Sequence, residues 1–148
     1  MKAMDEWNAI DILLAEDNDP EAELTVLALR KIGVINKLLR VCDGVEALAF
    51  IFREGKFAER DHALPKLILL DLMMPRAGGI AVLSQLRERA ATKNIPVGIL
   101  TASAEHSDFF DSQEMLVWDY LIKPVSPEAL FELASQSGLT IVQPAASP

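Results

Sequence analysis

The chain has 148 residues and a mass of 16.3 kDa, and 14 Lys and Arg against 22 Asp and Glu give a formal net charge of −8. This length suits one domain with one core, and 51% hydrophobic with 24% charged residues excludes a disordered or collagen-like protein. An acidic surface repels phosphate backbones, so we expect no nucleic-acid binding.

The sequence also argues against secretion and membrane insertion. No apolar run approaches the ~20 residues that a membrane-spanning helix needs, and the first residues do not resemble a signal peptide. The single cysteine, Cys42, cannot form an internal disulfide and ends an apolar segment, so we expect it to be a small buried residue. These features predict a cytoplasmic protein with no membrane association.

Short apolar segments alternate along the chain with segments of helical spacing. Asp19-Pro20-Glu21 and Ser126-Pro127-Glu128 are typical of helix starts, with Asp19 and Ser126 as the expected caps before a proline of the first turn. The alternation predicts an α/β fold, a doubly wound (βα)5 unit of the flavodoxin-like type with a parallel five-stranded sheet of order 2-1-3-4-5. The expected strands are 12–15, 38–42, 67–70, 97–100 and 118–122, and the expected helices are 19–32, 44–52, 80–89, 105–115 and one that begins near residue 126.

We expect residues 1–148 to form a single domain with a core over about 10–138. Residues 1–9 are predicted to be an N-terminal extension and residues 143–148 a flexible tail. The charged connection 53–65 is long for this fold and is predicted to be a surface insertion. No linker leads to a second module, so we expect no output domain.

Ligands of open α/β sheets bind at the carboxyl ends of the strands. The expected strand ends would bring together Glu16, Asp17, Asp71, Thr101 and Lys123. One such acid alone is more often a turn or helix cap, but three neighbouring carboxylates repel one another unless a cation lies between them. Carboxylate oxygens suit Mg²⁺, which commonly joins carboxylates to phosphate. We therefore predict a site for Mg²⁺ and phosphate, with Asp71 as a nucleophile that forms an aspartyl phosphate and Thr101 and Lys123 stabilising the transferred group.

Four motifs carry a resemblance to the receiver domain of two-component response regulators. They are Leu13-Leu14-Ala15-Glu16-Asp17-Asn18, Leu69-Leu70-Asp71-Leu72-Met73-Met74-Pro75 with Gly79, Leu100-Thr101-Ala102, and Tyr120-Leu121-Ile122-Lys123-Pro124. Their order and their placement at strand ends make the set specific, and the resemblance covers nearly the whole chain.

The resemblance implies a role for each matching residue. Asp71 would accept a phosphoryl group from a histidine kinase, and Lys123 would pair with the phosphate. Glu16, Asp17, Asp71 and the main-chain carbonyl of Met73 would hold Mg²⁺. Thr101 would move toward the phosphate, Tyr120 would be the switch aromatic, and the Lys123–Pro124 bond would be cis. Only intrinsic phosphoryl transfer and self-dephosphorylation are implied, so the chain would be a switch and not an enzyme.

With its insertion and without an output domain, the chain resembles the single-domain receivers that partner bacterial phytochrome histidine kinases. Leftover apolar residues of helix 19–32, such as Leu24 and Leu27, would form the face that docks the kinase. Large apolar residues near the fourth helix and fifth strand, Phe109, Phe110 and Trp118, suggest a homodimer built on that face.

Two other functions share part of this pattern but lack a residue that they need. A haloacid-dehalogenase-type phosphatase also uses Mg²⁺ and a strand-end aspartate, but the position of its general acid is Met73 here. A flavodoxin-like FMN binder needs a hydroxyl-rich phosphate loop after the first strand, where this chain has Glu16-Asp17-Asn18-Asp19.

Overall fold

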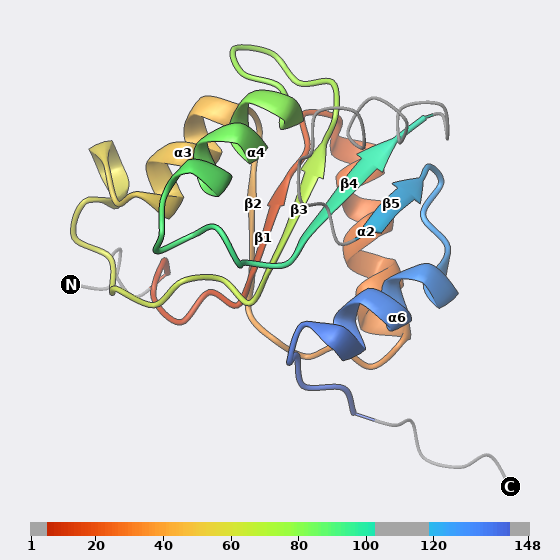
Figure 1. Cartoon of the computed structure of the whole chain (residues 1–148). Coiled ribbons are helices and arrows are strands. Elements are labelled where there is room, and N and C mark those ends of the chain that lie inside the picture. The colour runs from red at the N-terminus through yellow and green to blue at the C-terminus, as the bar shows by residue number, and fades with distance from the viewer. Residues whose placement is uncertain (1–5, 103–118, 143–148) are drawn as a thin grey trace, which may run out of the picture.

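The computed structural model describes residues 6–102 and 119–142 (Figure 1). Its elements in chain order are β1 (Ile12–Ala15), α2 (Asp19–Lys31), β2 (Leu38–Val41), α3 (Gly44–Ile51), the short 3₁₀ helix η1 (Gly55–Phe57), β3 (Leu67–Asp71), α4 (Gly79–Glu88), β4 (Val97–Thr101), β5 (Asp119–Ile122) and α6 (Pro127–Gln136). The sequence did not predict η1, but every other described strand and helix agrees with its predicted range to within one residue at the ends that the sequence located. The helix expected over 105–115 lies outside the described residues.

The five strands form one parallel sheet of order β2-β1-β3-β4-β5, which confirms the predicted topology. All residues of β1, β3 and β4 are buried, whereas β2 at one edge is mostly half-buried. The continuous apolar runs of the central strands follow from this burial, because helices cover both faces of the sheet.

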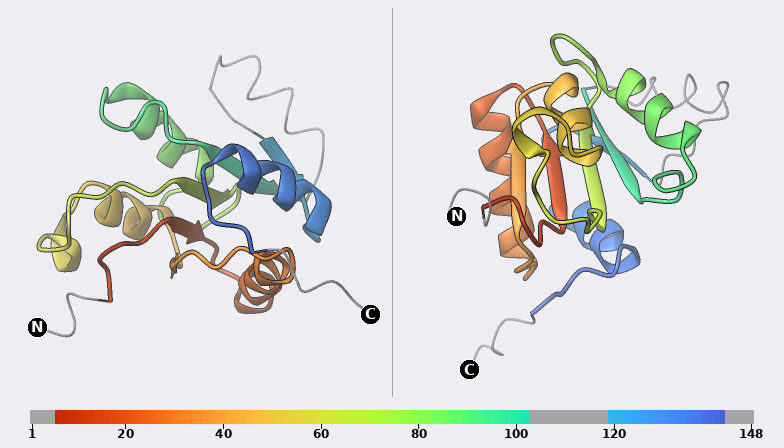
Figure 2. Two further views of the ribbon diagram at one scale, coloured as in Figure 1. Left: turned by 90° about the horizontal axis from the view of Figure 1, so that it is seen from below. Right: turned by 90° about the vertical axis from the view of Figure 1, so that its left-hand side faces the viewer.

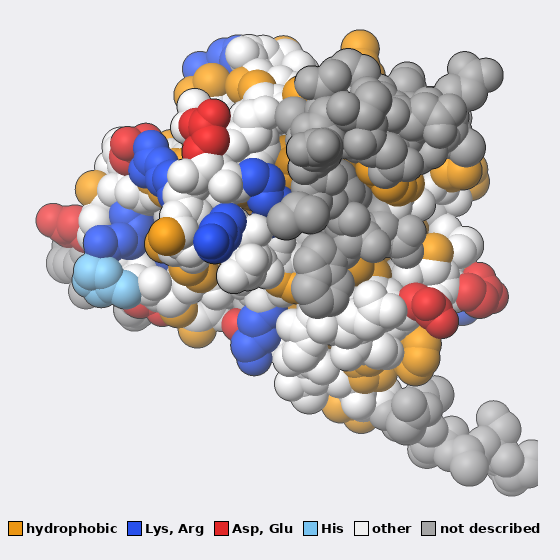
Figure 3. Space-filling view, in the orientation of Figure 1, with side chains coloured by type: hydrophobic (Ala, Val, Ile, Leu, Met, Phe, Trp, Pro, Cys, Tyr) orange, Lys and Arg blue, Asp and Glu red, His pale blue; other side chains and the backbone are white. Residues whose placement is uncertain are grey.

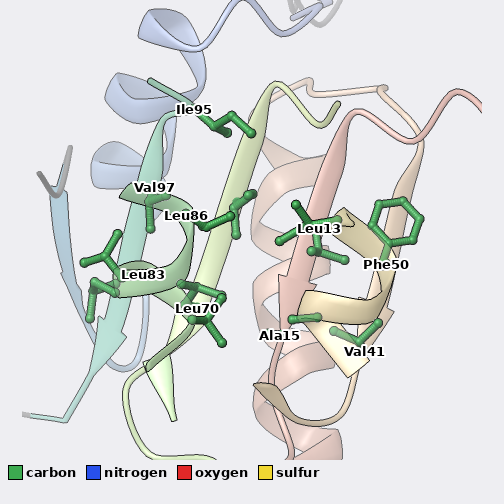
Figure 4. Packing of buried hydrophobic residues seen from close by; sticks show 14 of the residues in the cluster. Leu13, Ala15, Val41, Phe50, Leu70, Leu83, Leu86, Ile95 and Val97 are labelled. Carbon is green, nitrogen blue, oxygen red and sulfur yellow. The ribbon is translucent and has the colours of Figure 1, made fainter. Parts of the chain in front are cut away.

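Figure 2 shows the sheet between two helical layers, α3 with α4 on one face and α2 with α6 on the other. Successive residues of a strand point to opposite faces, so each strand contributes to two separate cores. Leu13, Ala15, Leu70 and Val97 pack with Phe50 of α3 and with Leu83 and Leu86 of α4 (Figure 4). Ile12, Leu14, Leu67, Leu69 and Leu100 pack with residues of α2 and α6.

Side-chain caps fix where the helices start. The sequence predicted Asp19 as the cap of α2, but the cap is Asn18, whose Oδ1 accepts a hydrogen bond from the Glu21 N–H at 2.9 Å. Asp19 therefore belongs to the first turn, where its charge favours the helix dipole. Ser126 caps α6 as expected, accepting from the Ala129 N–H at 3.1 Å.

The connection 53–65 is more firmly packed than a surface insertion needs to be. Its Phe57 is buried edge-on against Trp7 and Phe50, with ring centroids 4.9 and 5.2 Å apart. Arg60 is also buried, with 2% of its surface exposed. Figure 3 shows basic and acidic side chains interspersed with hydrophobic ones over this side of the molecule.

Cys42 is exposed and not buried, because β2 ends at Val41 and the following residue turns outward toward α3. Within residues 6–102 and 119–142, no helix is long and apolar enough to cross a membrane.

Candidate functional site

Backbone hydrogen bonds extend the strand pattern into the loops at the carboxyl edge of the sheet. The Glu16 N–H donates to the Val41 carbonyl at 3.0 Å, the Leu72 N–H to Leu100 at 2.9 Å, and the Lys123 N–H to Thr101 at 2.8 Å. The register pairs Ala15 with Leu70, so the residues that follow them, Glu16 and Asp71, also lie side by side. The sheet itself thus positions the predicted site residues.

These residues surround a cavity of about 280 Å³. Asp71 and Thr101 are buried in its wall, and Asp17 is exposed at its rim. Glu16 does not line the cavity but is fully buried beneath it. The lining residues are Asp17, Asn18, Glu21, Asp71, Leu72, Met73, Thr101, Ala102 and Lys123.

The Lys123 ammonium is the centre of the charged cluster. Its Nζ lies 2.8 Å from Glu16 Oε1, 2.5 Å from Glu21 Oε2 and 3.3 Å from Asp71 Oδ2. Although burial by itself lowers the pKa of Lys123, hydrogen bonds to Glu16 and Glu21 and the charge of Asp71 raise this pKa above its ordinary value. Lys123 therefore stays protonated in this setting.

One ammonium does not neutralise three carboxylates. Burial, together with the hydrogen bond and charge of Glu16, raises the pKa of Asp71 to about 7, against the opposing effects of Lys123 and the Met73 N–H. A carboxyl group with so high a pKa marks a place where further positive charge would bind favourably.

The donor set fits a hard divalent cation. Carboxylate oxygens of Glu16, Glu21 and Asp71 lie within 4.8 Å of one another, and Asp17 adds a fourth carboxylate at the cavity. The Met73 N–H donates to Asp71 Oδ1 at 3.2 Å, which holds the loop that carries the Met73 carbonyl against the site. The group contains only oxygen donors, which is the chemistry that Mg²⁺ and Mn²⁺ prefer.

Sequence reasoning missed two residues of this region, Glu21 and Arg40. The sequence places Glu21 only in the first turn of α2, whereas the structure brings its carboxylate to Lys123. Arg40 donates from Nε and Nη2 to the Glu16 carbonyl at 2.9 and 2.7 Å, and from Nη1 to Asp19 Oδ1 at 2.6 Å. A lone basic residue inside an apolar strand was the signal that could have identified it.

Of the two predicted switch residues, Thr101 lines the cavity and Tyr120 lies on the neighbouring strand. Thr101 ends β4, and Tyr120 of β5 pairs with Ile99 and is half-buried against the core under α3 and α4. The Lys123–Pro124 peptide bond is cis, the isomer that the resemblance implies. Phe109, Phe110 and Trp118, on which the dimer prediction rests, lie outside the described residues.

Comparisons with known proteins agree with this geometry. Residues 12–135 match the model of the response regulator receiver domain family. Response regulator Rcp1 of Synechocystis sp. is 34% identical over 122 residues, which cover 82% of each chain. Its Mn²⁺-bound structure has a TM-score of 0.70 at 32% identity and covers 90% of this chain and 98% of Rcp1.

Two further solved structures are similar. Bacteriophytochrome response regulator RtBRR has a TM-score of 0.82 at 37% identity and covers 93% of this chain and 82% of its own. The phosphorylated cyanobacterial phytochrome response regulator RcpA has a TM-score of 0.68 at 34% identity and covers 84% of this chain and 88% of its own. The chain therefore belongs to the response regulator receiver domain family of two-component signalling proteins and is homologous to phytochrome response regulators.

Proposed function

We propose that Asp71 accepts a phosphoryl group from a histidine kinase in a Mg²⁺-dependent reaction, and that phosphorylation switches a partner-binding face. The observation that carries this proposal is the buried Asp71 at the end of β3, which borders an open cavity and contacts the Lys123 ammonium. Membership of the receiver family supports it, whereas the phosphatase and the FMN binder are not favoured.

In the proposed reaction, an Asp71 carboxylate oxygen attacks the phosphorus of a phosphohistidine. A new P–O bond forms as the P–N bond breaks, and the departing imidazole nitrogen keeps the bonding pair and takes up a proton. Lys123 and the Thr101 hydroxyl stabilise the charge that develops on the phosphoryl oxygens. Mg²⁺, when bound, would supply the positive charge that lets an anion approach this acidic site.

Glu16, Asp17, Asp71 and the Met73 carbonyl are the groups that we propose to hold the ion. Asp71 is the nucleophile only when it is deprotonated, and a nearby cation lowers the pKa of a carboxyl group. We infer Mg²⁺ as the physiological ion from the oxygen-only donor set, and the Mn²⁺-bound form of Rcp1 supports a divalent ion of this kind.

The kinase is proposed to dock beside the site, on the face of α2. Leu24 and Leu27 each have 58% of their surface exposed there. Leu24 also borders a second cavity of about 300 Å³, adjacent to Lys123 and lined further by Thr25, Pro124 and Val125. The likeness to RtBRR and RcpA supports a phytochrome as the kinase, and we place the reaction in the cytoplasm.

For the output, we propose that Thr101 and Tyr120 carry the change to the region around β5, where the chain forms a homodimer. Ile122 at this edge is 48% exposed, which supports an apolar contact. Sedimentation of the phosphorylated and unphosphorylated protein tests this part. A monomer in both states at micromolar concentration contradicts it.

The central assignment is tested by labelling from a phosphorylated histidine kinase. We expect the intact mass to rise by one phosphoryl group in the presence of Mg²⁺, and the gain to be lost in a chelator and in Asp71→Asn. Glu59→Gln, which removes an exposed carboxylate from the insertion, serves as the control and should be labelled like the unmodified chain. Stoichiometric labelling of Asp71→Asn refutes the assignment.

A further inference from the structure

Three carboxylates surround the Lys123 ammonium, and the contact with Glu21 is a hydrogen bond. An ammonium group has three N–H donors and no acceptor. Glu16, Glu21 and Asp71 each place an oxygen within ion-pair distance of Nζ, and the Glu21 contact is the shortest of the three. Phosphorylation removes the carboxylate charge of Asp71, but a phosphoryl oxygen that approaches Lys123 still competes with Glu16 and Glu21 for the ammonium.

The exposure of the three acids determines which contact can be released at least cost. The side chains of Glu16 and Asp71 are 1% and 8% exposed, whereas that of Glu21 is 43% exposed. A buried carboxylate that loses its partner carries the full desolvation penalty, but an exposed one is hydrated instead. Glu21 is thus the partner that Lys123 can exchange.

Glu21 also lies at the boundary between two cavities. With Lys123 and Ala102 it lines both the phosphoryl-accepting cavity and the apolar one beside α2. Asn18 caps the Glu21 N–H, so the backbone that carries this side chain is fixed whether or not the ion pair is present. The Glu21 carboxylate can then turn toward solvent without disturbing the helix start.

We propose that Glu21 is a positioning residue that competes with the phosphoryl group for Lys123, and so limits how tightly the site holds that group. This inference rests on the proposed function of Asp71. In the unphosphorylated chain Glu21 draws the ammonium to its side. When a phosphoryl group arrives, Lys123 exchanges Glu21 for a phosphoryl oxygen while Glu16 keeps it oriented. Removal of the Glu21 contact therefore strengthens anion binding.

Beryllofluoride, a non-covalent mimic of the phosphoryl group, tests this on the full chain at saturating Mg²⁺, with affinity followed by intrinsic fluorescence. We expect Glu21→Gln to bind it about threefold to tenfold more tightly than the unmodified chain, because a charged competitor is removed. Glu21→Asp keeps the charge but is shorter by one methylene, so it should show a smaller gain. Glu23→Gln, an exposed acid two residues along the same helix, should show no gain.

The outcomes separate this inference from the function on which it rests. Unchanged or weaker binding by a folded Glu21→Gln variant overturns the competition, as does an equal gain in Glu23→Gln, which would mark a long-range effect of charge. Loss of binding in Asp71→Asn with no change in Glu21→Gln rejects the competition alone. Undiminished binding by Asp71→Asn rejects the phosphoryl-accepting role itself.

Discussion

Two regions of this molecule bury charged side chains, and they differ in how far the buried charge is compensated by neighbouring groups. At the insertion, the Arg60 guanidinium donates to the carbonyls of Phe50, Ile51, Asp61 and Ala63 at 2.7 to 3.1 Å and lies 4.1 Å from the ring centroid of Phe50. At the carboxyl edge of the sheet, three acids share a single ammonium.

The difference separates a stabilising role from a functional one. Phe50 and Ile51 belong to the last turn of α3, so Arg60 donates to carbonyls at the C-terminal end of this helix and places positive charge there. Arg60 donates four hydrogen bonds, and all four go to main-chain carbonyls. The acidic site keeps an excess of negative charge next to a cavity, which is stable only with a ligand or a raised pKa.

The largest expected effect comes from breaking the satisfied region. Arg60→Leu should lower the free energy of unfolding by about 3 kcal/mol, because several buried carbonyls lose their charged donor. Urea unfolding measures this loss, and labelling of Asp71 should persist in the folded fraction. Lys66→Leu, at an exposed position, should change stability by less than about 0.5 kcal/mol. A loss in Arg60→Leu no larger than that of the control contradicts the anchoring role.

The acidic site should respond to pH in the opposite sense from a stabilising carboxylate. Folded Asp71 has a pKa of about 7 and its ordinary value is 3.8, so between these values the folded state binds more protons than the unfolded one. Without metal, stability should therefore fall by about 2 kcal/mol as the pH rises from about 5 to about 8. Urea unfolding in a chelator at several pH values measures this slope.

Two variants test whether Asp71 causes this dependence of stability on pH. Asp71→Asn removes the titrating group, so it should be more stable than the unmodified chain near pH 8 and have a flatter profile. Glu59→Gln should keep the original slope. A slope that persists in Asp71→Asn would assign the titration to another group.

A smaller effect is expected from Arg40, which donates to the Glu16 carbonyl in the loop that carries the acidic site. Arg40→Gln should raise the dissociation constant for Mn²⁺ by about fivefold, because the Glu16 loop loses its anchor. Calorimetric titration measures the change. Arg40→Lys keeps the charge but cannot donate two hydrogen bonds to the Glu16 carbonyl, so it should also weaken Mn²⁺ binding. The exposed control Lys66→Gln should leave the binding unchanged. Unaltered affinity in both Arg40 variants would rule out the anchor.

The smallest effect is expected at Cys42. Because this thiol is exposed, Cys42→Ser should leave the free energy of unfolding within about 0.5 kcal/mol of the original value. A thiol reagent should react with Cys42 in the native protein as fast as in a short peptide. Protection of Cys42 from the reagent would contradict its exposure and indicate a buried thiol.

The topology and most of the acidic site could be predicted from the sequence because local patterns determine them. The apolar run before Asp71 specifies a strand buried on both faces, and the end of that strand places Asp71 at the ligand-binding edge. The motif that holds Lys123 and Pro124 follows β5 in the same way. Such features depend on neighbours in sequence and on one general rule of α/β sheets.

The parts that could not be predicted depend on contacts between distant segments. The Glu21–Lys123 pair joins residues of α2 to residues that follow β5, and no local pattern reports that distance. The burial of Arg60 requires α3 to end within reach of its guanidinium, and Trp7 packs on Phe57 across the same surface. The exposure of Cys42 reflects a strand that stops one residue early, which is within the ordinary uncertainty of strand ends.

The central position of β1 has a consequence for synthesis on the ribosome. The strand is fully buried, and its second neighbour, β3, pairs Leu70 with Ala15 and so emerges about 55 residues later. At ordinary translation speeds that interval lasts about 3 to 11 seconds, during which one edge of an apolar strand has no partner. Three acids directly after β1, Glu16, Asp17 and Asp19, place repulsive charge at the end of this strand and would discourage its pairing with another nascent chain. Glu16 and Asp17, which are proposed to bind a cation in the finished protein, would thus also protect the growing chain from aggregation.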